Sequence, residues 1–135
     1  MKLKRVKLET GGNGLFEITE DVRNTVTESG VTDGIAVIYI PHTTAGITVI
    51  SRMDKLGFED IEDEMDKLIP TRVNFKHQFD TPTDAAGHIK CSLQGVSAIL
   101  IIEDGKIQIG GSQGIFFFEF DGPRNREFFV KIIEG

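Results

Sequence analysis

Residues 96–134, VSAILIIEDGKIQIGGSQGIFFFEFDGPRNREFFVKIIE, decide the fold. The run 96–103 is followed by Asp104-Gly105, a preferred dipeptide for the two-residue turn of a β-hairpin, and then by a second short apolar run. QGIFFFEFD at 113–121 and REFFVKIIE at 126–134 supply two more strands, with Gly122-Pro123 as the break between them. This part of the chain is therefore predicted to be antiparallel β-structure.

Upstream, the run DGIAVIYIP at 33–41 is apolar at successive positions and rich in β-branched residues. This pattern is typical of a central strand that is covered on both faces. A strand is also expected at 3–10, ended by the glycine-rich residues 11–14, and another at 46–50.

Three segments have the periodicity and end signals of helices. The first is expected to be capped by Thr19 and to stop at Gly30, and the second covers 56–69 with apolar residues on one face. Thr83 or Asp84 is expected to cap a third, shorter helix that runs to Leu93. The sequence thus predicts an α+β fold of mixed, largely antiparallel β-sheet layers with about three helices. No repeat or linker divides the chain, so residues 1–135 are interpreted as a single domain.

Composition limits the classes of partner. The 15 basic and 21 acidic residues give a net charge of −6, which provides no broad positive field for nucleic acid or anionic lipid. No stretch approaches the roughly 20 apolar residues of a membrane-spanning helix. Cys91 is the single cysteine, which rules out an internal disulfide. We therefore expect a cytoplasmic protein with no nucleic-acid or membrane partner.

The sequence has only three histidines, His42, His77 and His88, placed at a strand junction, in a polar loop and on the short helix. Imidazole is a common ligand for zinc, and three histidine ligands leave positions open for water or substrate. Scattered surface histidines are the alternative, because the spacing matches no local metal motif. Asp84 lies four residues before His88, so it can share a metal with that ring or orient it; alternatively, it only caps the helix.

The strand at 113–121 suggests a pocket of another kind. Its alternation places on one face Gln113, Ile115, Phe117, Glu119 and Asp121. A buried carboxylate at Glu119 needs a cation or several donors, and Arg124 follows the next turn. A structural ion pair of Arg124 with Glu119 or Asp121 and an anion-binding role of Arg124 both fit this pattern.

Thr43 and Thr44, beside His42, offer hydroxyl and backbone N–H groups to an anionic ligand. A Thr-Thr pair is also common at a turn between two strands, so these residues carry no weight by themselves.

Three motifs, IPHTTAGITV at 40–49, DAAGHIKCSLQG at 84–95 and DGKIQIGGSQGIFFFEFDGPRNR at 104–126, resemble in order and spacing the YjbQ-like family. Members of this family are also described as secondary thiamine-phosphate synthases, and the likeness covers essentially the whole chain. The resemblance implies the YjbQ-like α+β fold, a homotrimer, and a divalent metal, zinc, bound by His42, His77 and His88.

The resemblance also implies a function. It suggests an enzyme that joins a hydroxymethylpyrimidine pyrophosphate to a thiazole phosphate, with catalytic roles for His42, Asp84, Glu119 and Arg124. Ligand-binding roles fall on Thr43, Thr44, Gln113, Asp121 and Arg124. The alternative is a non-catalytic trimer that binds a metal or small ligand for regulation or scaffolding.

Three departures bear on that choice. ISRMDK at 50–55 replaces the family's N-E-N-x-D-P segment, which favours the non-catalytic alternative. Ser112 stands where the family has Trp, and Asp84 stands where it has Asn.

Overall fold

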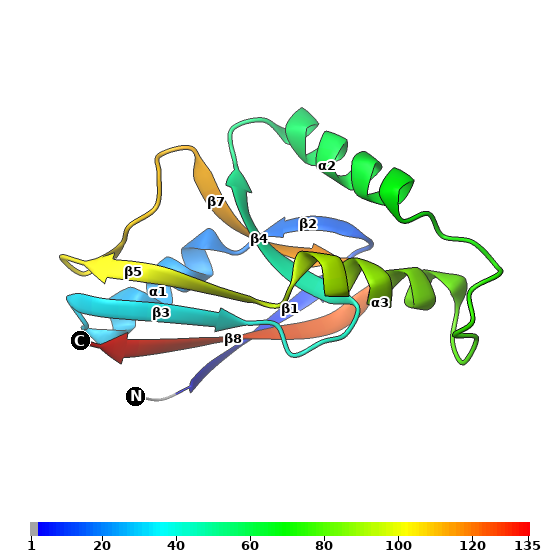
Figure 1. Ribbon diagram of the computed structural model, residues 1–135. Helices are drawn as coiled ribbons and strands as arrows, with labels where there is room; N and C mark the ends of the chain where they lie inside the picture. Colours follow the sequence, from blue (N-terminus) through cyan, green and yellow to red (C-terminus); the bar gives the residue numbers. More distant parts are fainter. Residues whose placement is uncertain (1–2) are drawn as a thin grey trace.

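The computed structural model describes residues 3–135, which form two antiparallel sheets and three helices (Figure 1). The larger sheet has the strand order β1 (Leu3–Thr10), β8 (Arg124–Glu134), β3 (Asp33–Tyr39), β5 (Ser97–Glu103) and β6 (Lys106–Ile107). The smaller sheet has the order β2 (Gly14–Glu17), β7 (Gln113–Glu119) and β4 (Ala45–Ser51). The helices are α1 (Thr19–Ser29), α2 (Lys55–Leu68) and α3 (Pro82–Gln94). The predicted α+β class with three helices is confirmed, and every strand pair is antiparallel.

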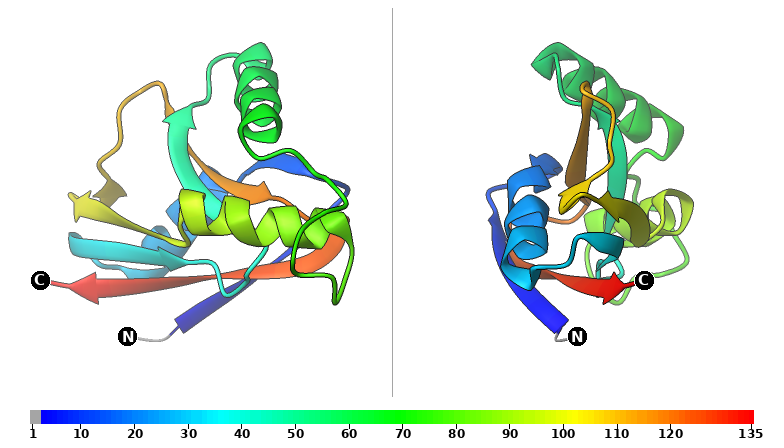
Figure 2. Two further views of the ribbon diagram at one scale, coloured as in Figure 1. Left: turned by 45° about the vertical axis from the view of Figure 1, so that its right-hand side comes forward. Right: turned by 90° about the vertical axis from the view of Figure 1, so that its left-hand side faces the viewer.

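The main core lies between the two sheets and α1. Its largest buried side chains include Phe128 of β8, Ile38 of β3 and Phe117 of β7. A smaller cluster on the other side of β7 contains Phe118 and Phe120. In the right-hand view of Figure 2, α1 lies on one side of the smaller sheet, and α2 and α3 lie on the other. Both faces of β7 are buried, as its alternation predicts.

The hairpin between β5 and β6 forms where the sequence places it. Asp104 and Gly105 have φ angles of 52° and 77°, the two successive positive values of a type I′ turn. Glycine adopts such values without strain, and aspartate tolerates them better than most residues.

Strand β3 is central in its sheet, but only one of its faces is fully covered within the chain. Ala36 and Ile38 are buried, whereas Ile35 and Val37 are half-buried and Tyr39 is exposed. The expectation that both faces are covered is therefore wrong for the single chain. A continuous apolar run predicts two apolar faces, but it cannot show what covers the second one.

The helix caps differ from the predicted ones. Thr19 is the first residue of α1, and its hydroxyl donates to Glu17 and accepts from the N–H of Ile115 instead of capping the helix. Gly30 ends α1 in the left-handed conformation, as expected. Neither Thr83 nor Asp84 caps α3, because Thr81 does so.

Helix α2 packs on the surface of the molecule, and none of its residues is fully buried. A 13-residue connection at 69–81, which has no regular secondary structure before the α3 cap, joins α2 to α3. No helix in residues 3–135 combines the length and the apolar character needed to cross a bilayer.

Candidate metal site

His77, Asp84 and His88 form the group of potential metal ligands in the described chain. One ligand atom from each residue lies within 4.8 Å of the others. Asp84 Oδ2 is 3.2 Å from Nε2 of His77 and 3.1 Å from Nε2 of His88. Helix α3 supplies Asp84 and His88 from one face, four residues apart, and the connection 69–81 brings His77 to them. The two imidazole rings stand edge to face, with centroids 5.1 Å apart.

The cap of α3 makes the Asp84 carboxylate available. The hydroxyl of Thr81 accepts a hydrogen bond from the backbone N–H of Asp84 at 3.1 Å. Because Thr81 caps the helix, the side chain of Asp84 does not have to do so. The carboxylate is instead buried against the two histidines, with 12% of its side chain exposed.

The contacts of His88 are those of a possible metal ligand. Nδ1 of His88 lies 3.2 Å from the carbonyl oxygen of Thr43. On the other side of the ring, Nε2 lies 3.1 Å from Asp84 Oδ2, where the two atoms can share a proton or a metal ion. The contact with Thr43 resembles the hydrogen bonds that orient metal-ligating histidines.

The spacing and exposure of the cluster also fit a metal. Ligands at 2.0–2.1 Å from a tetrahedral zinc ion are roughly 3.3 Å apart, close to the two distances measured from Asp84 Oδ2. The side chains of His77 and His88 are 47% and 39% exposed, so one side of the cluster is open to solvent. Two imidazoles and one carboxylate are a donor set used for catalytic zinc.

His42, the remaining predicted ligand, is not part of this cluster. Its Nε2 lies 3.1 Å from the backbone nitrogen and 3.0 Å from the backbone oxygen of Glu127 on β8. Burial, followed by the charge of Arg126, lowers the pKa of His42. The structure therefore brings together two of the three histidines, with Asp84 as the third donor.

The carboxylate of Glu119 is buried and held by hydrogen bonds from other residues of the chain. It is completely buried and accepts hydrogen bonds from Nε and Nη2 of Arg126, from the hydroxyl of Thr10 and from the N–H of Asp121. Burial by itself raises the pKa of a carboxyl group, but these hydrogen bonds outweigh it and lower the pKa of Glu119. All its acceptor positions face donors of the chain, so Glu119 has a structural role in this network.

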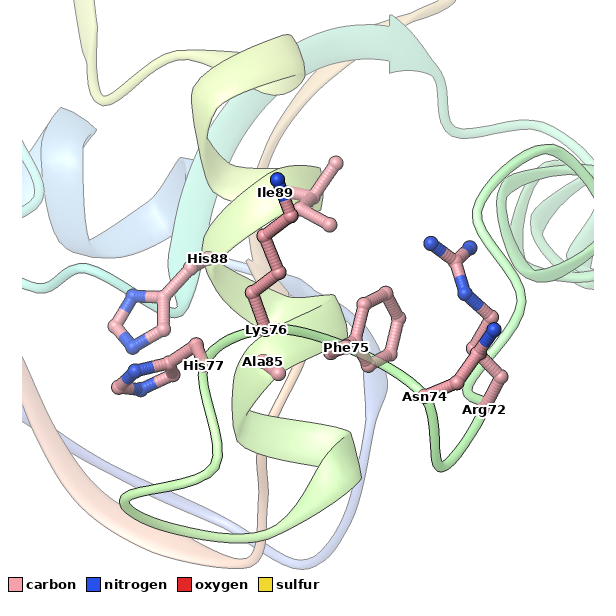
Figure 3. A pocket seen from close by; sticks show the side chains of 8 residues that line it. All are labelled: Arg72, Asn74, Phe75, Lys76, His77, Ala85, His88 and Ile89. Atoms are coloured by element: carbon pink, nitrogen blue, oxygen red, sulfur yellow. The ribbon is translucent and has the colours of Figure 1, made fainter.

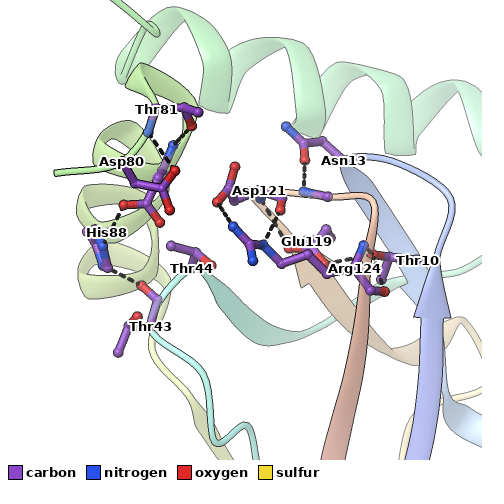
Figure 4. A network of polar contacts seen from close by, with 12 residues as sticks. Thr10, Asn13, Thr43, Thr44, Asp80, Thr81, His88, Glu119, Asp121 and Arg124 are labelled. Atoms are coloured by element: carbon purple, nitrogen blue, oxygen red, sulfur yellow. Dashed lines mark hydrogen bonds and ion pairs between the residues drawn. The ribbon is translucent and has the colours of Figure 1, made fainter. Parts of the chain in front are cut away.

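Arg124 is paired with Asp121, one of the two partners expected. Its Nη2 donates to Asp121 Oδ2 at 2.7 Å, and its Nε donates to the Asp121 carbonyl at 2.8 Å. These hydrogen bonds and the charge of Asp121 raise the pKa of Arg124, and the more distant carboxylates of Asp80 and Asp84 add to the effect. Figure 4 shows this ion pair beside the helix that carries His88.

The remaining residues with a predicted ligand-binding role lie in different places, and only one of them contacts the cluster. Thr43 reaches the cluster through its carbonyl oxygen, whereas its side chain is exposed. The hydroxyl of Thr44 is buried and accepts from Arg126 at 2.7 Å. Gln113 lies at the opposite end of β7 from Glu119, where its side chain accepts from the N–H of Gly110. The structure does not bring Gln113 to the cluster.

Fold and site together define a class: an antiparallel α+β protein of two sheets with a solvent-open cluster of two histidines and one carboxylate. The chain belongs to the family described as UPF0047 protein YjbQ-like, whose model matches residues 4–135.

Similar proteins span nearly the same length. A UPF0047 protein of Methanocaldococcus jannaschii is 53% identical over 88% of this chain and 84% of its own. The UPF0047 protein YugU of Bacillus subtilis is 37% identical over 97% and 98% of the two chains. A crystal structure from Clostridium acetobutylicum has a TM-score of 0.89 and 44% identity, and covers 96% of this chain and 99% of that one.

Proposed function

We propose that this protein is a metal-dependent enzyme that acts on a small phosphorylated molecule, with zinc held by His77, Asp84 and His88. The observation that carries the proposal is the position of Asp84 Oδ2 between two imidazole nitrogens at 3.2 and 3.1 Å. A zinc ion there would be held by three coordinate bonds, from two imidazole nitrogens and one carboxylate oxygen. A bound zinc ion supplies positive charge that can neutralise the oxygens of a phosphate group.

Arg124 is the second feature that suits a phosphorylated substrate. A guanidinium has five N–H donors, and two of them are used for Asp121. Three donors remain, on a side chain that is 44% exposed. Asp121 fixes the plane of the guanidinium, which lets Arg124 bind phosphate oxygens with little loss of conformational entropy.

The proposed reaction joins a hydroxymethylpyrimidine pyrophosphate to a thiazole phosphate. The thiazole nitrogen forms a bond to the methylene carbon of the pyrimidine, and the carbon–oxygen bond to pyrophosphate breaks, so pyrophosphate leaves with the electron pair. The main tasks of the protein are to hold the two molecules together and to neutralise the charge of the leaving group. Arg124 serves the second task, and the exposed side of the cluster leaves room for the first.

A turnover assay on the purified, zinc-loaded chain tests this proposal. We expect thiamine phosphate to form from the two substrates, and we expect Arg124→Gln to lower kcat/KM by at least roughly tenfold because a charge-assisted hydrogen bond is lost. Arg23→Gln changes an arginine of similar exposure, 43%, that is paired with Glu20 on α1; it is the matched control and should retain full activity. Zinc binding without product from these substrates would favour the non-catalytic alternative.

We also propose that three copies of the chain assemble through the open face of the larger sheet. In the strand register, Ile35 of β3 lies between Ile101 and Ile133, and Val37 lies beside Ile99. Ile99 and Ile101 are 67% and 62% exposed, which is unusual for isoleucine in the middle of a strand. A contiguous apolar face of this kind marks a contact surface.

Light scattering tests the assembly. The parent chain should have three times the mass of one chain, and Ile99→Asp should have the mass of a single chain because it places a charge in the interface core. Leu68→Asp changes an equally exposed residue, 69%, on the surface of α2 and should leave the trimer intact. A parent protein of monomer mass would refute the proposal.

A further inference from the structure

A cavity of about 560 Å³ lies directly beside the metal-ligand cluster (Figure 3). Its volume is within the usual range for a small-molecule site. His77 and His88 form one wall, and the rest is built from the connection 69–81 and from Ala85 and Ile89 of α3. The cavity is therefore continuous with the proposed centre.

The charged residues of this cavity are all cationic. Arg72 and Lys76 line it, and none of its lining residues is acidic. Within residues 3–135, neither Arg72 nor Lys76 has a carboxylate oxygen within 4.0 Å of its charged nitrogens. Two unpaired cations beside one cavity are notable in a chain of net charge −6, where acidic partners are abundant. Their combined charge matches a dianion such as a phosphate monoester better than a single carboxylate.

The other walls are apolar. Phe75 is buried, with 7% exposed, and packs with Ala85, while Ile89 is 42% exposed. The Arg72 guanidinium lies over the Phe75 ring, 4.3 Å from its centroid, which holds the cation against an apolar surface. In Figure 3, the guanidinium of Arg72 lies on the Phe75 side of the view, and the amine of Lys76 lies toward Ile89.

We propose that this cavity recognises an organic phosphate with an apolar ring: the phosphate binds Arg72 and Lys76, and the ring lies against Ile89 and Phe75. This extends the function proposed above, because it names the chemical class of ligand that lies beside the metal. Only the role of the metal rests on that function. The proposal assigns phosphate recognition to the exposed side chains of Arg72 and Lys76, in addition to Arg124. Burial of the ring distinguishes such a ligand from free phosphate.

Calorimetric titration of the full chain tests the proposal, with 1-naphthyl phosphate, inorganic phosphate and 1-naphthol as probes. We expect 1-naphthyl phosphate to bind at least roughly tenfold more tightly than either of the others, because only it combines the charged contacts with ring burial. Arg72→Gln and Lys76→Gln should each weaken its binding roughly tenfold. Both side chains are exposed, so these variants keep the core. Arg23→Gln, which changes a cation in a different cavity beside α1, is the control and should bind like the parent.

Titrations with and without zinc separate this proposal from the one on which it builds. If zinc does not bind but 1-naphthyl phosphate still requires Arg72 and Lys76, the metal proposal fails and the cavity assignment holds. If zinc binds but the two variants match the parent, the cavity assignment is overturned. Equal affinity for 1-naphthyl phosphate and inorganic phosphate would also overturn it.

Discussion

Replacing Arg126 with methionine is expected to lower the free energy of unfolding by about 3–5 kcal/mol, because Glu119 would then be a buried charge without a cation. Glu119 is fully buried and Arg126 is only 8% exposed, so water cannot substitute for the lost partner. The melting temperature should fall by roughly 10–20 °C for a domain of this size. Chemical denaturation at fixed protein concentration measures the change directly.

The loss should depend on pH in a defined direction. In the parent chain the pKa of Glu119 is below its ordinary value of 4.5, so the ion pair contributes stability above that pH and loses it as the pH falls through the lowered pKa. In Arg126→Met, burial without the cation raises the pKa of Glu119, and protonation then relieves the unpaired charge. The difference in stability between parent and variant should therefore shrink as the pH is lowered from 7 toward 4.

A double variant separates the unpaired charge from the loss of contacts. Glu119→Leu combined with Arg126→Met replaces the ion pair with apolar side chains and should recover most of the lost stability. If Arg126→Met alone is as stable as the parent chain, or if its deficit grows on acidification, the assignment of Glu119 as a structural carboxylate is wrong.

Replacing Asp84 with alanine is expected to weaken zinc binding by at least roughly 100-fold, because Asp84 Oδ2 is the oxygen atom that both imidazoles face. The Thr81 cap bonds the backbone N–H at position 84, which alanine retains, so α3 should remain folded. Competition titration with a chromophoric zinc chelator measures the affinity, and far-ultraviolet circular dichroism checks the helix.

His42→Ala is the discriminating control for that experiment. If the metal is held by His77, Asp84 and His88, this variant should bind zinc as tightly as the parent chain, because the His42 ring is bonded to the backbone of Glu127. A loss of affinity in His42→Ala equal to that in Asp84→Ala would instead support the set of three histidines that the family resemblance implies.

The strands were predictable because local patterns determine them. Alternation over 113–121 predicts a strand with two buried faces, and Asp104-Gly105 predicts the hairpin turn; the structure confirms both. The alternation in β8 also indicates that Arg126 is buried. In β8, Arg126 is two residues before the buried Phe128, so period two places it on the inward face, whereas Arg124 is closer to the strand end and remains half-exposed.

The site was predictable only in part, because its assembly depends on the tertiary path of the chain. The four-residue spacing of Asp84 and His88 indicates a shared helix face, and this pair is present. Nothing local shows that the connection 69–81 returns His77 to α3, or that His42 turns toward β8. The cap was also ambiguous, because Thr81, Thr83 and Asp84 are all residue types that cap helices, and only the structure shows that Thr81 does so.

The most direct test of the central claim is crystallography of the zinc-loaded chain, with anomalous diffraction recorded on both sides of the zinc absorption edge. We expect one anomalous peak per chain, about 2.0–2.2 Å from a nitrogen of His77, a nitrogen of His88 and an oxygen of Asp84. A peak at His42, or no peak between His77 and His88 in crystals that contain zinc, would contradict that claim.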